Sequence, residues 1–132
     1  MKALSTYLMQ HPLEARSSYD ILTRSSSHAR KVSVGPLEVT ILLESADGLP
    51  FSVAKFEAPP GATAPPQLHA NTREDWCALI CEGVMTIGTP RGERRLGPGA
   101  VMFVPRGAPF NWRNAGPATL RHRLTRKAAR ER

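Results

Sequence analysis

Residues 99–114 read G-A-V-M-F-V-P-R-G-A-P-F-N-W-R-N. This stretch holds an apolar run at 101–104, a corner at Pro105-Arg106-Gly107, and a second run that contains Phe110 and Trp112 and ends at Asn114. Short apolar runs bounded by proline and glycine are typical of β-strands joined by tight turns. The stretch therefore predicts two short strands, one on each side of the corner.

The same pattern extends over most of the chain. Short segments with apolar residues at a period of two alternate with turn residues such as Asp47-Gly48, Glu82-Gly83 and Gly97-Pro98-Gly99. The expected strands are 37–43, 51–57, 76–81, 84–88, 100–104, 110–114 and 119–125, with 37–43 and 51–57 forming a hairpin. Evenly spaced short strands of this kind predict an all-β fold, either a sandwich or an antiparallel barrel.

Length and composition fit a single domain. The chain has 132 residues, of which 41% are hydrophobic, and its 12 prolines and 10 glycines favour strands and turns over helices. We expect a partly irregular N-terminal arm over residues 1–36, a barrel over residues 37–125, and a basic C-terminal tail over residues 126–132.

The net charge of +7 does not predict a nucleic-acid-binding protein. Residues 121–132 alone carry a charge of +5, which leaves +2 for the rest of the chain. A basic end of this kind is typical of a solvated tail. The basic platform studded with aromatic residues that binds single strands is absent from the sequence. We therefore expect no nucleic-acid partner.

Two further features bear on location and redox state. The sequence has no apolar run of about 18 residues and no signal-peptide pattern at its start, so we expect a cytoplasmic protein with no membrane partner. Cys77 and Cys81 fall in one expected strand, about 13 Å apart at the usual rise per residue, which is too far for a disulfide bond. We expect both cysteines to be buried, reduced thiols.

Four residues at 99–114 carry a resemblance to a known family. Gly99, Pro105, Gly107 and Asn114 fit the second cupin motif, G-x5-P-x-G-x2-H-x3-N, and Phe110 stands where the motif has a metal-binding histidine. Residues 38–125 resemble the single-domain cupins, especially the small bacterial quercetin-dioxygenase-like proteins. The resemblance implies a double-stranded β-helix, which is a jelly-roll-like antiparallel barrel, and a homodimer.

The first cupin motif resembles P-G-x5-H-x-H-x4-E-x6-G. Which residues of this chain stand at its two histidine positions and its glutamate position depends on whether the spacing is counted from the start or from the end of the motif. The chain has Pro60-Gly61 at the start of the motif and Gly83 at its end. Counting back from Gly83 places the two histidine positions and the glutamate position at His69, Asn71 and Trp76. We prefer this count, because strand pairing holds register while loops absorb changes in length.

Counting forward from Gly61 gives a different set for the same motif. The two histidine positions then become Gln67 and His69, and the glutamate position becomes Glu74. The match of Glu74 favours this alternative. Phe110 replaces the histidine of the second motif under either count.

These substitutions alter the chemistry that the family implies. A standard cupin site gathers three imidazoles and one carboxylate around a divalent metal ion. Because this chain keeps so few of those donors, we expect no cofactor and a degenerate metal site. The alternative is a divalent metal held by His69 together with Glu74, Asp75 or His122.

The replaced positions predict an organic ligand instead of a metal. Trp76 and Phe110 stand at ligand positions, Phe110 and Trp112 share a strand face, and His122 shares a face with Leu120 and Leu124. The sequence therefore predicts an aromatic pocket that binds a small organic molecule. The residues expected to line it are His69, Asn71, Gln67, Trp76, Met102, Phe110, Trp112 and His122.

Two other functions are left open by the sequence. One is a metal-dependent enzyme of the dioxygenase or isomerase type that uses His69 with non-standard ligands. The other is a barrel filled by its own aromatic side chains, which would act as an interaction module. No catalytic residue is assigned, because no nucleophile, phosphate loop or zinc-binding helix motif is present in the sequence.

Overall fold

The computed structural model describes residues 21–64, 69–70 and 73–128. Within these residues the chain forms ten strands and two short 3₁₀ turns, η1 (Ser26–His28) and η2 (Ser45–Asp47). The strands are β1 (Arg30–Val34), β2 (Leu37–Leu43), β3 (Phe51–Ala58), β4 (His69–Ala70), β5 (Glu74–Glu82), β6 (Met85–Thr89), β7 (Gly92–Leu96), β8 (Val101–Val104), β9 (Pro109–Arg113) and β10 (Leu120–Ala128). The predicted all-β architecture is confirmed.

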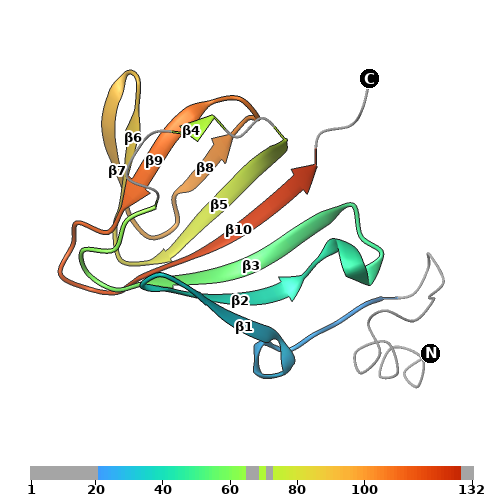
Figure 1. Cartoon of the computed structure of the whole chain (residues 1–132). Coiled ribbons are helices and arrows are strands. Elements are labelled where there is room, and N and C mark those ends of the chain that lie inside the picture. Colours follow the sequence, from blue (N-terminus) through green and yellow to red (C-terminus); the bar gives the residue numbers. More distant parts are fainter. Residues whose placement is uncertain (1–20, 65–68, 71–72, 129–132) are drawn as a thin grey trace.

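The strands form two sheets (Figure 1). The larger sheet has the order β1-β2-β3-β10-β5-β8, and the smaller sheet has the order β4-β9-β6-β7. All the pairings are antiparallel, including the predicted hairpin of β2 with β3. The last strand, β10, lies in the middle of the larger sheet between β3 and β5, although these three strands are far apart in sequence.

Strand β10 shows why these residues form a sheet with an inner and an outer face. Leu120, His122 and Leu124 are buried, whereas Arg121 and Arg123 between them are exposed. This alternation follows from the period of two in a strand. The apolar side chains of β10 therefore cover the interior, and its arginines face the solvent.

Three strands, β1, β4 and β7, lie in segments that were not predicted to be strands. β1 pairs with β2 and extends the larger sheet, and β7 pairs with β6. Most residues of β1 and β7 are exposed. β1 has only two apolar residues in alternation, Val32 and Val34, and β7 has only Leu96. β10 also runs on to Ala128, three residues beyond the strand end expected at residue 125.

The expectation that the two cysteines are buried is wrong. Cys77 and Cys81 are both free thiols, as predicted, but both are exposed. The inner face of β5 is formed by Ala78 and Ile80, so the odd-numbered positions on either side of them point outward. The run from 76 to 81 is apolar on both faces, which hid this alternation in the sequence.

Asn114, the last residue of the second cupin motif, holds three parts of the chain together. It is fully buried, and its Nδ2 donates to the carbonyl oxygens of Ala58 and Ala118, each at 2.9 Å. Its Oδ1 accepts a hydrogen bond from the backbone N–H of Gly116 at 3.1 Å. The side chain thereby ties the end of β3 to the turn between β9 and β10.

We expect Asn114→Ala to lower the free energy of unfolding by about 2 kcal/mol or more, because it leaves buried carbonyl groups without their donor. Asn111→Ala, within β9, is the control, and its expected effect is below about 1 kcal/mol because Asn111 is only half-buried. Urea denaturation followed by circular dichroism measures both values. Equal losses in the two variants would contradict the role assigned to Asn114.

Candidate functional site

A cavity of about 700 Å³ lies between the two sheets. Its volume falls within the range of small-molecule sites, about 300–1,000 Å³. Its lining is mainly apolar and comes from both sheets. The lining residues that carry the argument below are Phe56, Trp76, Ala78, Met85, Met102, Phe110, Trp112 and His122.

Aromatic rings form one part of the wall. Trp76 and Phe110 meet edge to face, with ring centroids 5.4 Å apart and an interplanar angle of 86°. Trp112 meets the ring of His122 in the same manner at 5.2 Å and 79°. Edge-to-face contacts at these distances are the preferred packing of aromatic rings. The two sheets are therefore joined through aromatic contacts beside the cavity.

His122 is the buried titratable residue among those that line the cavity. Only 4% of its surface is exposed, and its ring stacks on Phe56 of the neighbouring strand with centroids 5.0 Å apart and an angle of 8°. No hydrogen-bonding partner for the buried Nδ1 exists among the described residues. Burial lowers the pKa of His122 from 6.5 to about 4, so the imidazole is neutral near pH 7.

The charged residues of the cavity lie at its mouth in two ion pairs. Arg30 donates to Glu44 at 3.0 Å, and Arg126 lies 3.8 Å from Glu74. The side chains of these four residues are between 30% and 59% exposed, which places them in contact with solvent. Each arginine is balanced by a glutamate, so the mouth carries no uncompensated charge from these pairs.

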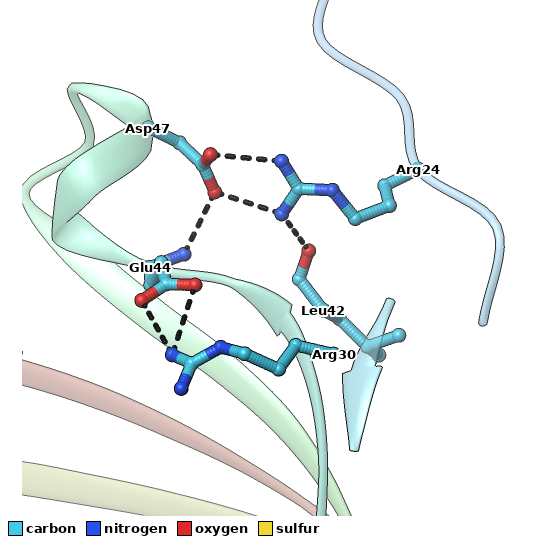
Figure 2. Close-up of polar contacts among 5 residues, drawn as sticks. All are labelled: Arg24, Arg30, Leu42, Glu44 and Asp47. Carbon is cyan, nitrogen blue, oxygen red and sulfur yellow. Dashed lines mark hydrogen bonds and ion pairs between the residues drawn. The ribbon is translucent and has the colours of Figure 1, made fainter. Parts of the chain in front are cut away.

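A buried ion pair holds the wall next to this mouth (Figure 2). The guanidinium group of Arg24 donates to both carboxylate oxygens of Asp47, at 2.8 and 2.9 Å, and to the carbonyl oxygen of Leu42 at 2.8 Å. The side chains of Arg24 and Asp47 are 8% and 2% exposed. Hydrogen bonding to Asp47 raises the pKa of Arg24, which therefore stays charged. The residues before β1 are thereby fixed to the turn that follows β2.

Five of the eight predicted site residues line this cavity: Trp76, Met102, Phe110, Trp112 and His122. Gln67 and Asn71 lie outside the described residues. The backbone of His69 pairs with that of Phe110 at the register position directly across from it. Glu74, from the alternative count, lines the cavity mouth, whereas Asp75 accepts a hydrogen bond from the backbone N–H of Arg106 at 2.9 Å.

Sequence reasoning missed several lining residues. Phe56 lies in a predicted strand, and its alternation with Ala54 was a usable signal for an inward position. Val32, in contrast, lines the cavity through the pairing of β1 with β2, and its segment was not predicted to be a strand. The part of the wall that β1 forms was therefore missed.

Phe110 and, in the count back from Gly83, Trp76 place aromatic side chains at cupin motif positions. Phe110 carries no donor atom and is buried against Trp76, whose indole N–H donates to Glu74 at 3.2 Å. Among the described side chains, no group of three or more His, Cys, Asp or Glu residues is placed to hold a metal ion.

The profile of the Cupin domain family matches residues 54–123, which is more than half of the chain. The chain belongs to the cupin family. The predicted cupin barrel is thereby confirmed. Strands β4 to β9 fall within the matched region, which also includes parts of β3 and β10. A search of curated protein sequences finds no match.

Solved structures of cupins share this fold. A predicted oxalate decarboxylase from Thermotoga maritima is 21% identical, with a TM-score of 0.69 over 80% of this chain and 97% of its own. The polyketide cyclase RemF from Streptomyces resistomycificus is 22% identical, with a TM-score of 0.67 over 82% and 80%. The cupin domain of Schizosaccharomyces pombe Cnp3 is 20% identical, with a TM-score of 0.67 over 80% and 72%. At these identities the likeness concerns the fold.

The described part of the chain contains no helix with the length and apolar character that a membrane crossing requires.

The acid stability of the protein is expected to depend on His122. Between pH 6.5 and about 4 the unfolded state binds a proton at this residue that the folded state does not bind, so stability falls as the pH is lowered through this window. The free energy of unfolding lost over the whole window amounts to about 3 kcal/mol, at about 1.4 kcal/mol per pKa unit. We expect His122→Phe to remove this part of the pH dependence.

The measurement is urea denaturation at half-unit steps between pH 4 and pH 8, with His28→Phe as the control because His28 is exposed. The difference between wild type and His122→Phe isolates His122 from the carboxylates, which also titrate near pH 4. Parallel pH profiles for the two proteins would contradict a neutral, buried imidazole.

Proposed function

We propose that this cupin binds a small, largely apolar organic molecule in the cavity between its sheets, without a metal ion. The proposal is carried by one observation, the apolar, aromatic-lined cavity of about 700 Å³ at the place where the cupin motifs converge. Apolar cavities with a few polar groups are the usual form of small-molecule sites. The bound molecule would be sensed, sequestered or transformed.

The aromatic residues that stand at metal-ligand positions of the cupin motifs support the same proposal. Phe110 and Trp76 contribute aromatic surface where a metal-binding cupin contributes donor atoms, and Trp112 adds an indole ring to the same wall. Flat apolar molecules pack favourably against such rings. The change therefore turns a polar coordination site into an apolar one.

The open volume also bears on the alternative of a filled barrel. The aromatic side chains of Trp76, Phe110 and Trp112 pack against neighbours at the cavity wall and leave the space beside them open. A barrel filled by its own side chains would leave little such volume. The cavity thus favours a ligand-binding protein over an interaction module. The homodimer and the cytoplasmic location stay predictions from the sequence.

We expect naphthalene to bind in this cavity and Ala78→Phe to weaken its binding at least tenfold. Ala78 is buried in β5 and lines the cavity, so a phenyl group there takes up ligand space. Leu79→Phe is the matched control, because Leu79 is the next residue of the same strand and is exposed on the outer face. Its affinity for naphthalene should equal that of the wild type.

The methionine methyl groups provide the readout. Met85 and Met102 line the cavity and are two of the four methionines in the chain. In protein labelled with ¹³C at the methionine methyls, naphthalene should shift these two signals in a saturable way. Absence of any saturable shift, or equal binding in Ala78→Phe with an intact spectrum, would overturn the proposal.

Elemental analysis by plasma mass spectrometry separates the proposal from the metal-enzyme alternative. Protein purified without a chelator should contain only traces of Fe, Mn, Ni, Cu and Zn. About one metal ion per chain, with a loss of naphthalene binding on addition of that metal, would favour the metal-dependent enzyme.

A further inference from the structure

We infer that His122 is the polar anchor of the cavity, and that it selects uncharged ligands that carry a hydroxyl group on an otherwise apolar body. The inference rests on the proposed function, because it names the class of molecule that the same cavity would take.

Without a ligand, the surroundings of His122 are unfavourable for a polar side chain. Buried polar atoms nearly always have a hydrogen-bonding partner, and a buried atom without one destabilises the fold. Nδ1 of His122 has no such partner among the described residues. Its inward-facing neighbours on β10 are Leu120 and Leu124, and its ring packs against Phe56 and Trp112. An apolar side chain would suit these surroundings better, so packing does not explain the histidine.

The imidazole ring of His122 is held by neighbours from both sheets. Phe56 of β3 stacks on one face of the imidazole, and Trp112 of β9 contacts it from the opposite sheet. The backbone of His122 pairs directly with that of Phe56, in a register between β10 and β3 that is unbroken on either side of it. The ring is therefore held in one orientation at the cavity wall, as a binding group should be.

The chemistry of the imidazole determines which ligand group it can bind. The imidazole is neutral near pH 7 because burial disfavours its charged form, so one ring nitrogen donates and the other accepts. A hydroxyl group can both donate and accept, and so it can pair with either nitrogen. A carboxylate would instead bring an unbalanced charge into an apolar interior, which is strongly unfavourable.

The charged residues of the cavity do not change this preference. Arg30 and Arg126 lie at the mouth, and each is paired with a glutamate. Burial lowers the pKa of His122. Among the described residues that line the cavity, the cationic side chains are these two paired arginines, so a carboxylate in the interior would find no free cationic partner there, whereas a hydroxyl group would find the imidazole of His122.

The test compares naphthalene, 2-naphthol and 2-naphthoate at pH 7, with the methyl signals of Met85 and Met102 as the readout. We expect 2-naphthol to bind about tenfold more tightly than naphthalene, the gain of roughly one good hydrogen bond, and 2-naphthoate to bind most weakly. In His122→Phe the preference for 2-naphthol should be lost, so that the ratio of its affinities for 2-naphthol and naphthalene falls from about ten to about one.

A second measurement uses the unmodified protein, in case the variant does not fold. In ¹⁵N-labelled protein, 2-naphthol should shift the ring nitrogen signals of His122 and leave those of the exposed His28 unchanged, whereas naphthalene should produce a much smaller change. Equal affinities for naphthalene and 2-naphthol, tightest binding of 2-naphthoate, or unchanged His122 signals would each overturn the role of His122.

These outcomes are separate from failure of the proposed function. If naphthalene binds in a manner sensitive to Ala78→Phe but 2-naphthol has no advantage, the cavity binds apolar molecules and only the assignment of His122 is wrong. If none of the three probes shifts the methionine methyls, both proposals fail together.

Discussion

The register of β10 is the constraint on which the rest of the structure depends. This strand pairs with β3 along one side and with β5 along the other, over almost its whole length. Because side chains alternate between the two faces, a slip of one residue would place Arg121 and Arg123 in the interior and would expose His122. The fixed register therefore establishes both the solvent-facing arginines and the inner wall of the cavity.

The sequence predicted those parts of the fold that bury one face. Strands β2, β3, β5, β6, β8, β9 and β10 carry apolar residues at a period of two between turn residues, and inward positions such as Phe110, Trp112 and His122 followed from that period. β1 and β7 are mostly exposed and carry few apolar residues, so their sequences distinguish them poorly from loops. The share of the cavity wall formed by β1 depends on its hairpin with β2, which the two valines of β1 alone do not predict.

The motif positions show how one fold accommodates different chemistry. The framework residues of the second motif retain their roles: Asn114 ties the turn after β9 to the end of β3, and Gly107 adopts a φ of 84° at the corner. The position between them that a metal-binding cupin fills with histidine holds Phe110 here. Structural and chemical positions of the motif are thus separable, and only the structural positions are needed to form the barrel.

The outward position of Cys77 makes the protein suitable for site-directed labelling. Cys77 precedes Ala78 in β5, so its thiol is exposed on the outer face while the next side chain lines the cavity. A maleimide dye attached there would lie on the outside of the strand that lines the cavity and would not enter the cavity. The chain has two cysteines, so replacement of Cys81 by serine would leave Cys77 as the single attachment point. A dye on the outer face would then respond to changes in the strand that lines the cavity, while the cavity itself stays free for a ligand.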